Sequence, residues 1–225
     1  MAYTARNSQG FQTRSATGMA PPDAVLASNT TVIRCSAGET LYVEGDAAPL
    51  CYQVVSGLVK EYNTLEDGRR QVADFYGVGE LFGISELKQQ LHTAEAITDC
   101  AVRCYKRDQF LKAVSSSPEL SHEFLDTLMT RLHRSRERMI MIGRMSALQR
   151  VAAFLMRLSR EQHATSKIRF LMSRQDIADH LGLTIETVCR ALTEMKRRGV
   201  IMFETARLFS IPDADTLDDI VHGTH

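Results

Sequence analysis

Three polar side chains at helical spacing, Glu186, Cys189 and Arg190, offer the clearest chemistry in this sequence. Glu186 and Arg190 are four residues apart, so both lie on one face of a helix and the carboxylate is expected to brace the guanidinium. A guanidinium donates two hydrogen bonds to guanine O6 and N7, and a carboxylate accepts one from cytosine N4. The pattern favours a helix that reads base edges in DNA. An ordinary surface ion pair is the alternative, because Glu-x-x-x-Arg alone is a weak motif.

Two predicted helices joined at Gly182 must position these side chains. Ser173 is the expected N-cap of the first helix and Thr184 that of the second, while Gly182 supplies the left-handed turn. The predicted inward positions are Ile177, Ala178 and Leu181 in the first helix and Val188, Ala191, Leu192 and Met195 in the second. With an earlier helix over residues 147–161, capped by Ser146, and two short apolar strands at the end, these elements predict a winged helix-turn-helix.

Further polar residues flank the reading face. Contacts with phosphates, which fix register without carrying sequence information, are predicted for Arg174, Gln175, Thr184, Thr187 and Lys196. Cys189 has two interpretations. It is either a small contact for a thymine methyl or a redox-regulatory thiol. In the second interpretation nearby arginines favour the thiolate, and its oxidation blocks DNA binding.

Composition sets the broad class. The 225 residues, 44% of them hydrophobic, suffice for one large or two modest cores. The absence of a long apolar run and of a secretion signal, together with five cysteines that fit a reducing compartment, predicts a cytoplasmic protein without a membrane partner. The formal net charge is zero, but residues 144–212 hold twelve Lys and Arg against six Asp and Glu. That surplus favours a nucleic-acid partner over a merely solvated surface.

Four regions are predicted along the chain, and they define an α+β fold. Residues 1–24 are a polar N-terminal arm. Residues 25–115 hold short strands separated by Gly and Asp turns, which indicate a β-roll resembling a cyclic-nucleotide-binding domain. Residues 116–145 form a long helix that Pro118 opens, and residues 146–225 form the winged helix-turn-helix domain.

The long helix carries a narrow apolar seam on a charged surface, which predicts a homodimer of paired helices. Packing of the seam on the chain's own roll is the alternative. The predicted dimer interface consists of Leu120, Phe124, Leu128, Leu132, Met139 and Ile142.

In this order and length, the three parts resemble the CRP/FNR family of bacterial transcription regulators over about residues 30–212. The resemblance rests on GETL (38–41), GELFG (79–83), SRQDIA (173–178) and LTIETVCR (183–190). It implies a homodimeric activator that binds double-stranded DNA and RNA polymerase, with Glu186 and Arg190 reading bases. Ile185 replaces the arginine of the cyclic-AMP regulator, which points to the FixK-like branch. That branch implies a palindromic TTGAT-type operator and target genes for low-oxygen respiration or nitrogen fixation.

Departures from the family pattern bear on cofactors. Cyclic-nucleotide binders place an arginine near the position of Glu95, where an anion would meet repulsion without a compensating cation. The chain has no Cys-x₂-Cys spacing for an iron–sulfur cluster. We therefore expect no cofactor and no metal. A regulator gated by haem or another small molecule is the alternative, with His92 or Cys100 as the axial residue.

Cys100 and Cys104 are expected in the core of a strand predicted over residues 98–110. At four residues apart along a strand they are too distant for a disulfide. A cysteine-based redox enzyme is a remote alternative. The sequence has no catalytic residues by pattern, because it lacks a nucleophile–base pair, a phosphate-binding glycine loop and a metal motif.

Overall fold

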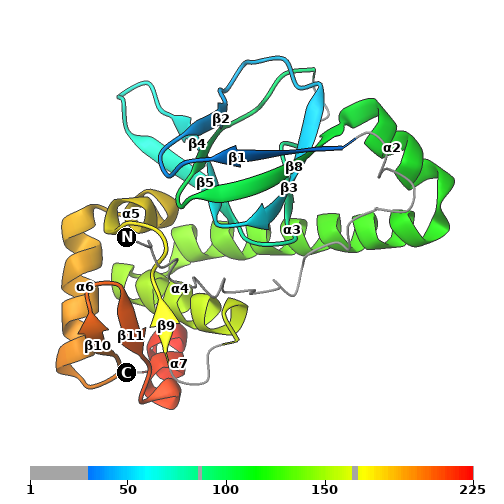
Figure 1. Cartoon of the computed structure of the whole chain (residues 1–225). Coiled ribbons are helices and arrows are strands. Elements are labelled where there is room, and N and C mark those ends of the chain that lie inside the picture. The colour runs from blue at the N-terminus through cyan, green and yellow to red at the C-terminus, as the bar shows by residue number, and fades with distance from the viewer. Residues whose placement is uncertain (1–29, 86–87, 164–166, 225) are drawn as a thin grey trace, which may run out of the picture.

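A computed structural model describes residues 30–85, 88–163 and 167–224, so the predicted arm 1–24 lies outside the described residues. Figure 1 shows a β-roll, one long helix running beneath it, and a group of shorter helices and strands at the far end of that helix. The predicted α+β class and the order of its three parts are confirmed. Within the described ranges, no helix is both long and apolar enough to span a bilayer.

The roll consists of two four-stranded antiparallel sheets, ordered β1-β8-β3-β6 and β2-β7-β4-β5. The strands are β1 (Thr31–Cys35), β2 (Thr40–Tyr42), β3 (Leu50–Ser56), β4 (Val59–Thr64), β5 (Arg70–Tyr76), β6 (Leu81–Phe82), β7 (Thr93–Ala96) and β8 (Cys100–Lys106). The aromatic rings of Tyr42, Tyr52, Tyr76 and Phe82 stack in the interior, with centroids 5.2–6.2 Å apart. The roll is therefore closed around an aromatic core.

A helix, α2 (Arg107–Ser116), follows β8 directly. The strand predicted over residues 98–110 is thus wrong beyond Lys106. The helix start carries no side-chain cap, so the usual local signal is missing from the sequence. α2 forms because Phe110, Ala113 and Val114 bury one face against the roll.

The long helix α3 (Pro118–Arg144) begins at the predicted proline, and the Ser117 hydroxyl caps it by accepting from the Leu120 amide at 3.2 Å. Leu120 and Phe124 pack on the core shared by the roll and α2, and the Phe124 ring lies 5.6 Å from that of Phe110. These two predicted interface residues therefore pack within their own chain. This is the alternative interpretation, in which the seam packs on the chain's own roll. The exposed apolar residues of α3 are Leu125, Leu128, Met129, Leu132, Met139, Ile140 and Ile142, called here the α3 stripe.

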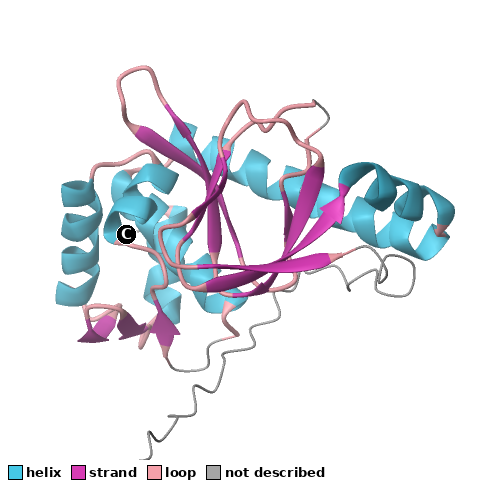
Figure 2. Ribbon diagram, turned by 45° about the horizontal axis from the view of Figure 1, so that its top comes forward, coloured by secondary structure: helices cyan, strands magenta, loops and turns pink. Residues whose placement is uncertain are grey.

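The C-terminal domain is a winged helix-turn-helix. It contains α4 (Ala147–Glu161), β9 (Ile168–Arg169), α5 (Arg174–Leu181), α6 (Ile185–Arg197), β10 (Met202–Thr205), β11 (Leu208–Ser210) and α7 (Ala214–His222). The predicted caps Ser146, Ser173 and Thr184 all accept hydrogen bonds from the first turns of their helices, and Gly182 is left-handed at φ 63°. In Figure 2 the short strands of the wing lie apart from those of the roll.

Two elements of this domain were not predicted. β9 pairs with β11 and widens the hairpin to three strands. α7 begins at Asp213, whose side chain accepts from the Thr216 amide, and it buries Leu217 and Ile220 against the domain core. Asp213 is thus a helix cap.

Candidate nucleic-acid interface

The helix α6 divides cleanly into a buried and an exposed face. The residues Val188, Ala191, Leu192 and Met195 are buried in the domain core, as predicted. Glu186, Cys189 and Arg190 are exposed, together with Lys196. The Thr184 hydroxyl caps the helix by accepting from the Thr187 amide at 3.3 Å. One helix thus presents a polar side to solvent while its other side fixes it to the scaffold.

The expected ion pair between Glu186 and Arg190 is not formed in the described structure. Arg190 Nη2 donates to the Thr187 hydroxyl at 3.3 Å. Hydrogen bonds from the backbone amide of Glu186 itself and from the Thr184 hydroxyl lower the pKa of the Glu186 carboxyl, and the charge of Arg190 adds to this effect. Glu186 is therefore drawn to the amides of the helix N-terminus, and both charged groups remain open to solvent.

The predicted phosphate contacts occupy different settings. Arg174 is half-buried, with its guanidinium carbon 3.9 Å from the Phe170 ring centroid, and its Nη2 donates to the Ala206 carbonyl at 3.1 Å. Its Nη1 is the only buried side-chain nitrogen or oxygen without a hydrogen-bond partner among the described residues. Gln175 donates to Asp179 at 2.6 Å. Lys196 projects into solvent. Arg174 thus joins the wing to the helix pair while one donor stays unused.

Cys189 differs from the other four cysteines. It is exposed on α6, whereas Cys35, Cys51, Cys100 and Cys104 are buried. Burial raises the pKa of Cys51 and of Cys100 to about 12 and that of Cys104 to about 11. Cys100 and Cys104 lie in the roll core, as the sequence predicted. An oxidant in solution therefore meets Cys189 first.

The interior of the roll holds a buried carboxylate surrounded by donors. Glu61 accepts hydrogen bonds from the Tyr42 hydroxyl, from the Tyr76 hydroxyl at 2.6 Å and from the Gly83 amide at 3.2 Å. Burial, followed by the negative charge of Glu61, raises the pKa of Tyr42 and Tyr76 far above the usual value of a phenol. These hydroxyls therefore stay protonated and act as donors.

The prediction that Glu95 lacks a compensating cation is wrong. Lys60 Nζ lies 2.9 Å from Glu95 Oε1. Glu95 also faces away from the roll interior, because its neighbours Ala94 and Ala96 are the residues of β7 that pack in the interior. The sequence could not reveal this pair, since its two members lie on different strands.

The two proposed axial residues have other partners. His92 Nδ1 lies 2.5 Å from the Asn63 side-chain oxygen, and Cys100 is buried directly opposite Cys35 on the neighbouring strand. No group of three or more potential metal ligands occurs within the described ranges.

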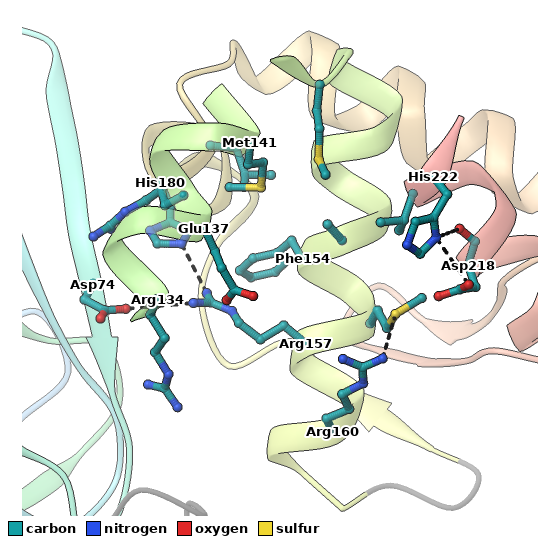
Figure 3. Close-up of a pocket in the computed structure, with 16 residues that line it drawn as sticks. Asp74, Arg134, Glu137, Met141, Phe154, Arg157, Arg160, His180, Asp218 and His222 are labelled. Carbon is teal, nitrogen blue, oxygen red and sulfur yellow. Dashed lines mark hydrogen bonds and ion pairs between the residues drawn. The ribbon is translucent and has the colours of Figure 1, made fainter. Parts of the chain in front are cut away.

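A cavity of about 400 Å³ lies where α3, α4, α5 and α7 meet. In the close-up of Figure 3, Arg157 points from α4 toward His180 and Asp74, and Phe154 forms part of the wall. His180 is almost fully buried, and its Nε2 lies 3.1 Å from Arg157 Nη2. Sequence reasoning gave His180 no role, because its neighbours come from the roll and from α4.

Taken together, the roll, the long helix and the exposed face of α6 define a DNA-binding protein of the winged helix-turn-helix class. Comparison with protein families agrees. Residues 149–220 match the Crp-like helix-turn-helix domain, and residues 32–117 match the cyclic nucleotide-binding domain.

Known proteins place the chain more closely. The nitrogen fixation regulation protein FixK of Rhizobium meliloti (strain 1021) is 40% identical over 180 residues, which cover 80% of this chain and 82% of that protein. The transcriptional activatory protein AadR of Rhodopseudomonas palustris is 34% identical over 76% of this chain and 73% of its own length. The solved structure of FixK2 from Bradyrhizobium japonicum has a TM-score of 0.80 and 34% identity, covering 85% of this chain and 96% of that one.

The chain belongs to the CRP/FNR family of transcription regulators, in its FixK-like branch. It is a DNA-binding regulator of transcription and not an enzyme.

Proposed function

We propose that two copies of this chain bind a palindromic TTGAT-type operator as a homodimer and activate transcription in the cytoplasm. The observation that carries the proposal is the exposed row of Glu186, Cys189 and Arg190 on a helix whose opposite face is locked into the core. Two such helices related by a two-fold axis read two half-sites about one DNA turn apart, so the operator is expected to be palindromic.

The test is a selection of random oligonucleotides with the purified protein, followed by affinities on the selected site. Arg190→Ala is expected to lose discrimination at one base pair per half-site, by about 1–3 kcal/mol or roughly 5- to 150-fold. Lys196→Ala, which removes a predicted phosphate contact, is expected to weaken all sequences alike. If Glu186→Ala and Arg190→Ala together leave the selected sequence unchanged, α6 is not the reading helix.

Dimerisation is assigned to the α3 stripe. Four predicted residues, Leu128, Leu132, Met139 and Ile142, lie in it, and Leu125, Met129 and Ile140 extend it. A row of large apolar side chains along one helix is costly to leave in water and favours pairing with a second copy. The contributions of Leu120 and Phe124 are structural, because they hold α3 to its own roll.

We infer that the roll works without cyclic nucleotide or an iron–sulfur cluster. Its interior is filled by four stacked aromatic rings, and Glu61 adds a buried carboxylate that repels a phosphate. Calorimetry with cyclic AMP and cyclic GMP is expected to give no heat of binding at micromolar ligand. Micromolar affinity for either nucleotide contradicts this part of the proposal.

Oxidation of Cys189 is proposed to inhibit DNA binding. Sulfenic or sulfinic acid at this exposed position places a polar or negative group against the DNA. Selection and affinity measurements are therefore run with reduced and with peroxide-treated protein, and again with Cys189→Ala. Peroxide is expected to weaken the wild type only. An equal loss in both proteins assigns the effect to another residue.

Contact with RNA polymerase and a role in nitrogen fixation or low-oxygen respiration are proposed from similarity. The relatives named above are a nitrogen fixation regulation protein and a transcriptional activatory protein. Transcription from a promoter that carries the selected operator, measured with purified polymerase, tests activation directly. Binding without any increase in transcript contradicts activation.

A further inference from the structure

The β-roll holds the first helix of the helix-turn-helix by a buried charge cluster. Lys60 on β4 places its Nζ 2.7 Å from Asp176 Oδ1 on α5 and 2.9 Å from Glu95 Oε1 on β7. The Lys60 side chain is 5% exposed and that of Asp176 is 9% exposed. Burial by itself lowers the pKa of Lys60, but the hydrogen bonds that its ammonium donates to Asp176 and Glu95 raise the pKa above its ordinary value. The ammonium is therefore charged and paired with two carboxylates.

Asp176 is also the residue that fixes the start of α5. Its Oδ2 accepts from the Ser173 amide at 3.0 Å, and the Ser173 hydroxyl accepts from the Asp176 amide at 3.0 Å, which is a reciprocal capping box. One carboxylate thus binds the helix end with one oxygen and the roll with the other. Movement of α5 relative to the roll separates Lys60 from Asp176.

The other end of α5 is also attached to the roll. Gln71 on β5 donates to the Asp179 carbonyl at 2.7 Å, and His180 Nδ1 lies 3.3 Å from the Val72 carbonyl. Leu58, Val72 and Phe75 of the roll share one buried apolar cluster with the C-terminal domain. Because α6 packs directly against α5, fixing both ends of α5 sets the direction in which α6 projects.

We infer that Lys60 is a positioning residue for DNA binding, holding the reading helix at a fixed angle to the roll through Asp176. Apolar contacts at the junction are non-directional and tolerate sliding, whereas a paired ammonium with two carboxylates tolerates little displacement. Buried ion pairs of this kind give orientation more than net stability. In a dimer, the Lys60–Asp176 ion pair of each subunit sets the distance between the two reading helices.

This inference rests on the proposed binding to a palindrome, and its test uses the spacing of that palindrome. The operator is first selected with the wild-type protein. Affinities are then measured on this site and on versions whose spacer is one base pair longer or shorter. Absence of any palindrome in the wild-type selection contradicts the proposed function itself, before Lys60 is tested.

Lys60→Met keeps the length of the side chain and removes its charge. If this variant lowers the fraction of molecules in which α5 is held against the roll to roughly one tenth, the apparent affinity weakens about tenfold. The penalty for a changed spacer is expected to shrink, because released domains adapt to either spacing. The salt dependence of binding is expected to stay unchanged, since no phosphate contact is lost. Lys60→Arg, which keeps the charge, is expected to restore both affinity and spacer preference.

The matched control is Lys112→Met, which removes an exposed lysine of α2. If Lys60→Met keeps the affinity and spacer preference of this control, the inference is overturned. A salt slope reduced by about one also overturns it, because Lys60 then contacts a phosphate. Should Lys60→Met fail to fold, Glu95→Gln removes the negative charge of one partner of the ammonium. It must change spacer preference in the same direction, and an unchanged preference counts against the inference.

Discussion

His180 leads to a quantitative prediction about acid. The ring is buried where α5 meets the roll and α4, and the rings of Phe75 and Phe154 lie 5.0 and 6.0 Å away. Since the Arg157 guanidinium only donates, His180 Nε2 accepts from it at 3.1 Å. The proton therefore sits on Nδ1, which donates to the Val72 carbonyl at 3.3 Å. The folded protein needs the neutral ring in this one tautomer.

The cost of acidification follows from the pKa difference. Burial, followed by the positive charge of Arg157, lowers the pKa of His180 to about 3, although the negative charge of Asp74 opposes the shift. In the unfolded chain an ordinary histidine titrates near pH 6.5. Below that pH the unfolded chain binds a proton that the folded protein refuses, so stability is lost as the pH falls. Between pH 7 and pH 5 the loss is about 2 kcal/mol, from about 1.4 kcal/mol per pH unit.

Urea unfolding at pH 7, 6 and 5 measures this loss. His180→Gln keeps one donor and one acceptor but does not titrate, so its stability is expected to fall by about 2 kcal/mol less than that of the wild type over this range. The control is His133→Gln, because His133 is exposed on α3 beside Glu137. Equal pH dependence of the wild type and His180→Gln refutes the neutral, buried assignment.

Three further predictions concern the roll, the reading helix and the dimer. Tyr76→Phe removes a 2.6 Å hydrogen bond to the buried Glu61, so calorimetry is expected to show a free energy of unfolding lower by about 1.5–3 kcal/mol. An unchanged melting temperature shows that this hydrogen bond does not stabilise the roll. Thr184→Ala removes the cap of α6 and is expected to cost about 1 kcal/mol in urea unfolding; no change means that water replaces the cap. Leu132→Lys puts a charge into the α3 stripe and is expected to shift the dimer to monomer in light scattering. The control Arg136→Lys, at an exposed position of the same helix, is expected to leave the dimer intact. A dimer that survives Leu132→Lys is held together by other residues.

The family and the architecture could be predicted because their signals are local. Ser146, Ser173 and Thr184 cap the helices that the sequence assigned to them, and Gly182 turns the chain between α5 and α6. Each cap acts within about four residues, so it is visible in the order of residue types alone. The exposed face of α6 followed from the same reasoning, because a helix with one apolar side must show the other.

The errors lie where local signals are weak or absent. α2 starts without a side-chain cap directly after a strand. Nothing local therefore marked the end of the strand, and the predicted strand was extended into the helix. The seam of α3 follows one periodicity, and the sequence could not say that Leu120 and Phe124 pack on the roll while Met139 stays exposed. Periodicity defines a helix face, but the surrounding structure decides what covers it.

The sequence by itself determined the helix-turn-helix and the polar face that α6 exposes, because capping, periodicity and residue type act over a few positions. Tertiary structure alone decided how that helix is held. Lys60 and Asp176 are 116 residues apart in the chain, and their ammonium and carboxylate meet at 2.7 Å. No spacing rule connects such residues. Burial of both charges becomes favourable only after folding has brought them together, which is why the direction of the reading helix is a property of the folded molecule.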